Sequence, residues 1–295
     1  EDMAVRCEDG TYCNPDTTFD AISNFARQLN FLNGRRTSLY AEAANWAASP
    51  YAGAGERDID NDGEKEYYLA SDKVLAFFEN DGGRMIAAFA REEQTGAAVS
   101  MIGNHLGFPD FDDEREAETI ENSRRTSGLV DFYAAGPDTN GYVNDVYSAE
   151  VLIESLRFTS SDDMISKTIT LGATDTQLVV NYELDPGVQS LFVRFGLSPD
   201  IGKLLEHGQE FLDLQDDGAA MRLENQASGA AVALRYAGTL YNAAWNDEAG
   251  DGTANTPRNQ AMTHVAELLL SEQNSSFAIE LTLPEPPDNG LGDDD

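Results

Sequence analysis

The chain has 295 residues, of which 53 are acidic and 19 are basic, so its formal net charge is -34. Nucleic-acid binding requires a basic face, so this composition argues against it, and an anionic membrane surface would repel the chain. With 41% hydrophobic residues the chain can bury a sizeable core, but no apolar run is long enough to span a membrane. The acidity is typical of a secreted protein or of one from a calcium-rich or salty environment.

The first fifteen residues are polar and contain the two cysteines of the chain, Cys7 and Cys13. In an exported protein this pair would form a small local disulfide, whereas in a reducing compartment it would be two idle thiols. The chain begins at Glu1 rather than Met, which we take to indicate a processed product. We therefore expect an extracellular or periplasmic protein with a Cys7–Cys13 disulfide.

Two helices are predicted before residue 50. The segment 16–32 keeps apolar residues at helical spacing, with Asp16 or Thr17 as the cap and Asn33-Gly34 as the stop. A second helix is predicted over 37–48, where we expect Trp46 to pack in the core. Together they would form a helical hairpin, followed by a linker over 50–55.

From Glu66 onward the hydrophobic pattern changes to that of short strands separated by turn signals. No regular alternation of strands and helices is present, which argues against a doubly wound or barrel fold of α/β type. The fold class predicted is mainly β, an antiparallel two-sheet supersandwich preceded by the N-terminal helical hairpin. Strands are predicted at 66–70, 74–78, 84–89, 99–102, 129–133, 150–158, 164–171, 177–184, 190–197, 220–224, 230–236 and 276–283.

Two later segments are less regular. The segment 263–270 fits a helix or a strand equally well by periodicity. The segment 198–207 is predicted to be a short helix, with Ser198 as its cap and Pro199 at its first helical position. The domains expected are 1–55 (cysteine loop and helical hairpin), 56–284 (β-sandwich) and 285–295 (acidic tail).

Carboxylates alternate in the segment that leads into the first predicted strand, and Gly63 interrupts them. Bare carboxylates at this spacing repel one another, and a hard cation such as Ca²⁺ removes that repulsion. The twelfth position counted from Asp58 is Leu69, so the segment is not an EF-hand. A surface turn rich in Asp and Gly, without metal, is the alternative. The predicted calcium ligands are Asp58, Asp60, Asp62, Glu64 and Glu66.

The sequence resembles the entry to a known domain in three places. These are Trp46, the acidic segment described above, and the following run 74–85, which carries a Gly82-Gly83 hairpin signal. It is the C-terminal β-supersandwich, of galactose-mutarotase-like fold, that follows the catalytic barrel in family 57-type glycoside hydrolases. The segments 127–133 and 197–205 are similar to later parts of such domains. The resemblance implies an accessory domain that packs on a catalytic domain, contacts glucan or assembles with copies of itself. The family's catalytic carboxylates lie on the barrel, so their roles are carried onto no residue here.

Aromatic side chains beside predicted loops are candidates for sugar contact, because the flat faces of sugars pack on rings. The best candidate is Trp245, with Tyr241 and Asn246 beside it; packing in the core or at a sheet edge is the alternative. The three histidines, His105, His207 and His264, lack metal-type spacing, and we expect no catalytic residue.

These observations leave three hypotheses for function. The first is a non-catalytic, calcium-stabilised accessory β-sandwich of an exported carbohydrate-active system of the α-glucan type. The second is a self-assembling surface or filament protein whose acidic faces are bridged by Ca²⁺. The third, weaker hypothesis is a stand-alone glycoside hydrolase. The expected partners are carbohydrate, a catalytic domain or other copies of the chain.

Overall fold

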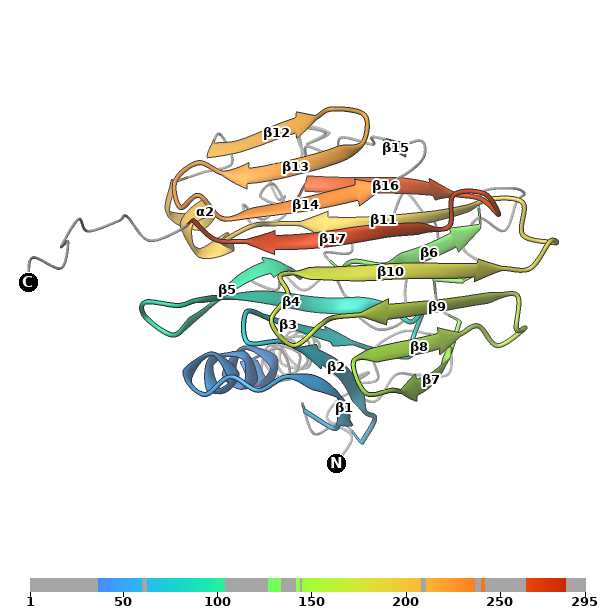
Figure 1. Cartoon of the computed structure of the whole chain (residues 1–295), viewed down its shortest axis with the longest axis horizontal. Helices are drawn as coiled ribbons and strands as arrows, with labels where there is room; N and C mark the ends of the chain where they lie inside the picture. Colours follow the sequence, from blue (N-terminus) through green and yellow to red (C-terminus); the bar gives the residue numbers. More distant parts are fainter. Residues whose placement is uncertain are drawn as a thin grey trace, which may run out of the picture.

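A computed structural model describes residues 37–59, 63–103, 127–133, 142–143, 145–207, 211–236, 240–241 and 264–284. These residues form two antiparallel sheets that lie face to face (Figure 1). The described residues are therefore mainly β and form a two-sheet sandwich, which confirms the predicted fold class. In this part of the chain no helix is both long and apolar enough to cross a membrane.

The first sheet has nine strands in the order β1-β2-β3-β4-β5-β11-β16-β15, with β6 paired to β11. Its strands are β1 (Gly53–Arg57), β2 (Glu66–Ala70), β3 (Val74–Phe78), β4 (Met85–Glu92), β5 (Ala97–Ile102), β6 (Val130–Tyr133), β11 (Leu191–Leu197), β15 (Leu240–Tyr241) and β16 (His264–Leu270).

The second sheet has eight strands in the order β12-β13-β14-β17-β10-β9-β8-β7. Its strands are β7 (Ser148–Val151), β8 (Ser155–Thr159), β9 (Ile165–Thr170), β10 (Gln177–Leu184), β12 (Leu212–Asp216), β13 (Ala220–Asn225), β14 (Ala231–Tyr236) and β17 (Ser276–Thr282).

The main core lies between the two sheets and follows from strict alternation along the strands. In β10, Leu178, Val180 and Tyr182 are buried, while the residues between them face outward. Because successive side chains of a strand point to opposite sides, one sheet face becomes apolar and the other polar. Most of the residues buried between the two sheets form one continuous cluster, which is the main core.

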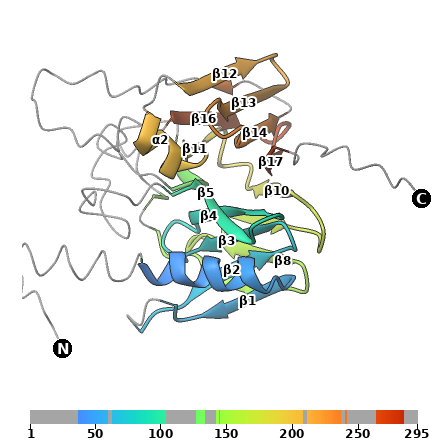
Figure 2. The same cartoon turned by 90° about the vertical axis from the view of Figure 1, so that its left-hand side faces the viewer.

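A second core lies on the other side of the nine-stranded sheet, where the described helix over 37–48 packs on β2, β3 and β4 (Figure 2). Trp46 is 1% exposed there, and its Nε1 donates a hydrogen bond to the carbonyl oxygen of Ser71 at 3.0 Å. The predicted helix over 37–48 and the core position of Trp46 are confirmed. The first helix of the predicted hairpin lies outside the described residues.

Several predicted elements differ from the structure. The single strand expected over 150–158 is two strands, β7 and β8, joined by a turn in which Ile153 is 89% exposed. The expected linker contributes β1, which begins at Gly53. The ambiguous segment 263–270 forms β16, a strand.

The predicted capping of the short helix was also wrong. Helix α2 (Ile201–His207) begins two residues later than Pro199, and its cap is Asp200 rather than Ser198. The Asp200 side chain accepts a hydrogen bond from the backbone amide of Lys203, three residues along. A carboxylate at this position satisfies an amide that has no partner within the helix.

We expect Trp46→Phe to lower the free energy of unfolding by about 1–3 kcal/mol, because the buried Ser71 carbonyl loses its indole donor. Chemical denaturation monitored by circular dichroism measures this change. The control is Tyr51→Phe, which removes a hydroxyl at the protein surface and should cost under about 0.5 kcal/mol. Equal effects for the two variants would contradict the structural role of the Trp46 hydrogen bond.

Candidate functional site

The predicted calcium loop connects β1 to β2, two adjacent antiparallel strands. Of the five predicted ligands, Asp58, Glu64 and Glu66 are described, whereas Asp60 and Asp62 lie outside the described residues. Gly63 has a φ of 96°, a left-handed conformation that glycine adopts without strain. The loop therefore turns at the glycine where the sequence indicated a turn.

Two of the predicted ligands hold the loop's own backbone. The Glu66 side chain accepts a hydrogen bond from the amide of Ile59 at 2.5 Å, and Asp58 Oδ2 accepts one from the amide of Gly63 at 3.2 Å. Glu66 is 6% exposed, and Ile59 packs in the same cluster as Trp46. The ends of the loop are thus tied to the sandwich through carboxylate–amide bonds.

Basic residues flank the loop. Arg57 forms an ion pair with Glu42 of the helix over 37–48, and Lys65 forms one with Glu56 across the β1–β2 pair. Among the described residues no group of three or more His, Cys, Asp or Glu side chains is placed to hold a metal. A calcium site here would therefore need Asp60 and Asp62 in addition to the described carboxylates. Oxygen donors of this kind suit Ca²⁺.

One of the predicted sugar-contact residues belongs to a strand at the edge of the nine-stranded sheet. Tyr241 lies in β15 and pairs in register with Glu267 of β16. Trp245 and Asn246 lie outside the described residues, as do Cys7 and Cys13 of the predicted disulfide. The structure therefore places only one of the three sugar-contact candidates, at a sheet edge.

Next to this edge is a buried ion pair that the sequence did not indicate. Arg194 Nε donates to Glu267 Oε1 at 2.6 Å, joining β11 to β16. The two side chains are 6% and 4% exposed, so the pair faces other protein atoms rather than solvent. Its role in the structure is to connect two strands.

The most extensive polar contact lies between the two sheets, and we call it the inter-sheet cluster: Lys167, Asp131, Tyr147 and Tyr182. Lys167 belongs to β9 of the eight-stranded sheet and Asp131 to β6 of the nine-stranded sheet. Lys167 Nζ donates to Asp131 Oδ2 at 2.7 Å and to the carbonyl oxygens of Gly82 and Leu129 at 3.0 Å each. All three donors of a lysine ammonium are thus used.

Both oxygens of Asp131 are also engaged by tyrosine hydroxyls. Tyr182 donates to Oδ1 at 2.7 Å, and Tyr147 donates to Oδ2 at 3.1 Å. The side chains of Lys167 and Asp131 are 0% exposed. A buried ion pair is tolerated only when its remaining hydrogen-bonding groups are satisfied, as they are in this cluster.

The backbone is shaped around this cluster. Leu129, whose carbonyl accepts from Lys167, has a φ of 56°, which non-glycine residues rarely adopt. At Gly83 an added Cβ would lie 2.8 Å from Lys167 Cε and 2.9 Å from Tyr147 Cδ2. Gly83, predicted only as a hairpin signal, thus makes space for the lysine.

Burial favours the uncharged forms of both Asp131 and Lys167. Desolvation raises the pKa of Asp131, although Lys167 and the two tyrosine hydrogen bonds oppose this shift. Desolvation lowers the pKa of Lys167; Asp131 opposes this shift, and the positive charge of Arg84 adds to it. Arg84 is itself fully buried, with its Nη2 bonded to Glu79 Oε2 at 3.0 Å.

A groove of about 600 Å³ lies away from this cluster, near the end of β17. Its lining mixes the basic residues Lys73 and Arg91 with the acidic residues Glu92 and Glu93. Arg91 Nε is engaged with the carbonyl oxygen of Ala47 at 2.7 Å. None of the predicted site residues lines this groove.

No family model and no curated protein matches the chain. Solved structures similar to it include a 4-alpha-glucanotransferase from Thermococcus litoralis, with TM-score 0.48 and 11% identity, covering 83% of this chain and 42% of that one. A putative mutarotase (YeaD) from Salmonella typhimurium has TM-score 0.46 and 11% identity, covering 79% of this chain and 94% of that one. A YidC insertase has TM-score 0.41 and 7% identity, covering 84% and 45%.

This chain thus spans less than half of the glucanotransferase and of the insertase. The three neighbours carry different activities in their names, and their identities of 7–11% are too low to transfer any of these activities.

We expect Lys167→Met to lower the free energy of unfolding by about 3–5 kcal/mol, because it leaves Asp131 buried without its cation. Denaturant titration measures this loss. The control is Arg157→Met, which breaks the solvent-exposed Arg157–Glu183 pair on the same sheet and should cost less than about 1 kcal/mol. A loss of under about 1 kcal/mol for Lys167→Met would contradict the described cluster.

Proposed function

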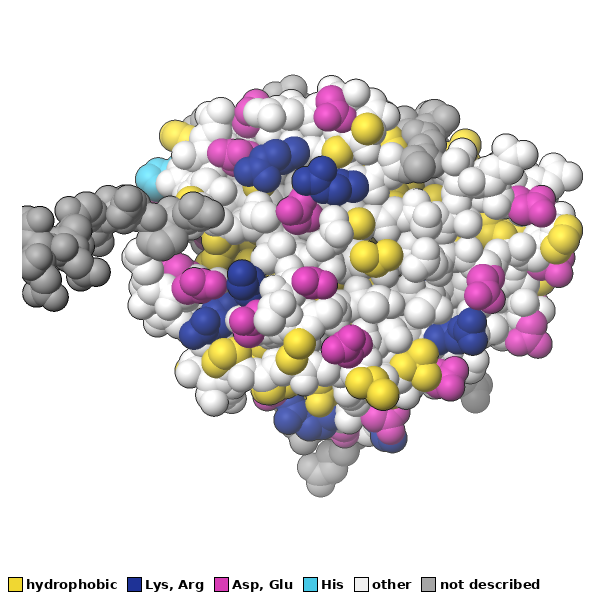
Figure 3. Space-filling model, viewed as in Figure 1, with side chains coloured by type: hydrophobic (Ala, Val, Ile, Leu, Met, Phe, Trp, Pro, Cys, Tyr) yellow, Lys and Arg dark blue, Asp and Glu magenta, His cyan; other side chains and the backbone are white. Residues whose placement is uncertain are grey.

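We propose that this chain is a non-catalytic, calcium-stabilised accessory β-sandwich of an exported carbohydrate-active system of the α-glucan type. The observation that supports this most is the outward face of the eight-stranded sheet, the side opposite the core. No described helix covers this face, which is the one seen in Figure 3. A broad uncovered sheet face is a surface against which another domain can pack.

The outward face carries mainly small and uncharged side chains at its centre. In β9 these are Ser166, Thr168 and Thr170, and in β10 they include Val179 and Asn181. Neighbouring side chains of this kind form a flat surface that loses little side-chain entropy when it is covered. Such a surface suits contact with a protein better than stacking on a sugar ring, for which aromatic side chains are needed.

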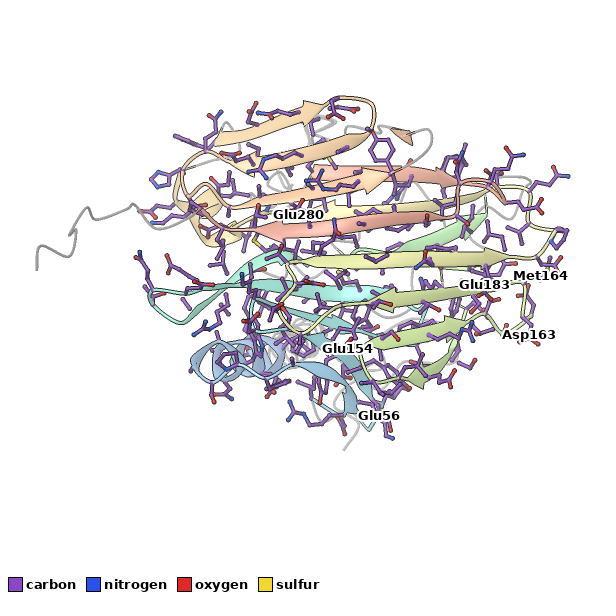
Figure 4. All side chains as sticks on the ribbon, in the orientation of Figure 1. Glu56, Glu154, Asp163, Met164, Glu183 and Glu280 are labelled. Atoms are coloured by element: carbon purple, nitrogen blue, oxygen red, sulfur yellow. The ribbon has the colours of Figure 1, made fainter. Side chains whose placement is uncertain are left out.

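The charges on this face largely compensate one another. Arg157 pairs with Glu183, Arg235 with Glu280, and Arg222 with Glu224. Figure 4 labels Glu183 and Glu280 on β10 and β17, within the sheet. In a chain with net charge -34, a face whose cations are matched by acids avoids the repulsion that would oppose docking.

An apolar turn lies at the edge of the same sheet. Between β7 and β8, Leu152 is 39% and Ile153 is 89% exposed, and Val151 before them is 36% exposed. Consecutive exposed apolar side chains mark a contact site more often than scattered ones do. We infer that this turn and the outward face together pack on the catalytic domain of the system.

The carbohydrate-active part of the proposal comes from the resemblance to family 57-type glycoside hydrolases, and the non-catalytic part from the buried ion pairs. In each of the two buried pairs, Lys167–Asp131 and Arg194–Glu267, the basic and the acidic side chain contact each other inside the protein. The residues proposed to contact the sugar are Tyr241, Trp245 and Asn246. Of these, Tyr241 belongs to β15 of the nine-stranded sheet, which does not carry the proposed docking face.

Calcium in the β1–β2 loop would replace the repulsion between neighbouring carboxylates by attraction to one ion. A metal held by the native chain alone, at about 100 times its dissociation constant, adds about 2.7 kcal/mol to the free energy of unfolding. We therefore expect the melting temperature to rise by several degrees between chelator and calcium, as measured by differential scanning calorimetry. The variant Asp60→Ala should abolish this rise.

The matched control for this experiment is Asp216→Ala at the end of β12. Asp216 also lies just before a glycine, two residues ahead of Gly218, and accepts a hydrogen bond from the Gly218 backbone amide at 2.8 Å, but it lacks the alternating carboxylates. This variant should keep the calcium-dependent rise. If wild type and Asp60→Ala melt at the same temperature in calcium and in chelator, the calcium proposal is wrong.

The sugar proposal predicts that the purified chain is retained by insoluble starch and that Trp245→Ala is not. Tyr51→Ala, which removes an exposed aromatic ring in the described part of the chain, should be retained like the wild type. Retention is measured by co-sedimentation at matched protein concentration. Equal recovery of wild type and Trp245→Ala in the pellet would contradict the assignment.

The second candidate is a self-assembling surface or filament subunit, favoured by the same outward face, which no described helix covers, and by the exposed turn at Ile153. Sedimentation velocity in calcium and in chelator separates the two candidates. An accessory domain stays monomeric under both conditions, whereas a calcium-bridged subunit forms assemblies that chelator dissolves. Turnover of α-glucan that is lost on changing one carboxylate would instead support the glycoside hydrolase hypothesis.

A further inference from the structure

We propose that Lys167 and Asp131 form a covalent modification site: the two side chains condense to an intramolecular amide, an isopeptide bond, that joins the two sheets. The geometry points to this because the amine and the carboxyl group already touch, with Nζ 2.7 Å from Oδ2. They come from opposite sheets, β9 and β6, so the bond would cross the main core. This inference goes beyond the proposed function and does not depend on it.

The surroundings hold both groups in position for the reaction. Lys167 Nζ is fixed by the carbonyl oxygens of Gly82 and Leu129, and Asp131 is fixed by two tyrosine hydroxyls. Intramolecular reactions between well-oriented groups reach effective concentrations of about 10⁵–10⁸ M. Amide formation from an unactivated acid is slow in water, but here the reactants are held together throughout the life of the folded protein.

The site also excludes water. The side chains of Lys167 and Asp131 are 0% exposed, Tyr147 within the cluster is 1% exposed, and the neighbouring Phe158 is 0% exposed. Once the water released by condensation has departed, no solvent is in contact with the buried amide to reverse the reaction. Exclusion of water therefore favours the amide over its hydrolysis.

The reaction requires the amine and the acid in their neutral forms. Burial raises the pKa of Asp131 and lowers the pKa of Lys167, so desolvation moves both groups in the required direction. The buried charge of Arg84 disfavours the ammonium form of Lys167 further. Transfer of one proton from Nζ to Oδ2 then gives the reactive pair and removes two buried charges.

The two tyrosines match the two oxygens of the carboxyl group. In the first step the Nζ lone pair forms a bond to Asp131 Cγ, and negative charge develops on Oδ1. The Tyr182 hydroxyl, 2.7 Å from Oδ1, donates to that charge, as in an oxyanion site. Tyr147 donates to Oδ2, the oxygen that leaves.

In the second step a proton passes from Nζ to Oδ2, the Cγ–Oδ2 bond breaks and Oδ2 departs as water. The balance is one amine and one carboxylic acid giving one amide and one water, without oxidant, reductant or co-reactant. The amide keeps a single N–H, which donates to the carbonyl oxygen of Gly82 or of Leu129, and the other carbonyl gives up its lysine donor. The product is a permanent link between β6 and β9.

Intact-mass spectrometry of the full purified chain, reduced beforehand with a thiol, tests the proposal. The wild type is expected to be lighter than its sequence by the mass of one water. Lys167→Arg and Asp131→Ala are each expected to have the full mass of their sequences. Tandem spectra of the digested wild type should show the peptide with Asp131 joined to the peptide with Lys167.

Three results would overturn the proposal. One is a wild-type protein at its full sequence mass after folding and prolonged incubation at neutral pH. Another is a water loss that persists in Lys167→Arg, because dehydration at an Asp-Gly step such as Asp62-Gly63 would also produce it. The third is a water loss that peptide mapping places outside Lys167 and Asp131. The wild-type measurement decides the question even if a variant fails to fold.

Discussion

The contact between Lys167 and Asp131 is the interaction on which the two-sheet arrangement depends most. The rest of the core between the sheets is built mainly from apolar side chains, whose contacts are non-directional and tolerate small shifts of one sheet against the other. The inter-sheet cluster allows no such shift, because each donor and acceptor has one position. Gly83 and the left-handed Leu129 are local consequences of fitting a lysine between the sheets.

The acidity of the chain imposes a second constraint, which the structure meets in different ways at different places. On the outward face, arginines and glutamates of different strands form ion pairs. In the β1–β2 loop, backbone amides donate to Asp58 and Glu66. A cation bound by the carboxylates of this loop would be a third way. The ion pairs of the outward face and the proposed calcium ion in the β1–β2 loop would therefore both reduce the repulsion between acidic side chains.

The sequence predicted the central strands well because their alternation directly reports burial. β9 and β10 bury every second residue, and the predicted strands 164–171 and 177–184 match them closely. Edge strands lack this signal: β12 is largely exposed and acidic, and β1 is rich in glycine, so both were missed. Leu152 and Ile153 continue the apolar pattern of a strand, although they lie in an exposed turn. For this reason the sequence predicted β7 and β8 as a single strand.

The candidate sites were predictable only where they are local in sequence. The alternating carboxylates near Gly63 indicated a loop between residues that the structure joins as β1 and β2. The inter-sheet cluster gave one signal, a lysine at an inward position between Ile165 and Ile169. Its partner could not be found, because which aspartate meets that lysine depends on how the two sheets stack.

The most direct test of this account is the electron density around Lys167 and Asp131 in a crystal structure at atomic resolution. The account predicts continuous density between the sheets, with Lys167 Nζ and Asp131 Cγ at about the 1.33 Å length of an amide C–N bond. Separate side chains at hydrogen-bonding distance would contradict the covalent link. A Lys167 side chain directed away from Asp131 would contradict the inter-sheet cluster itself.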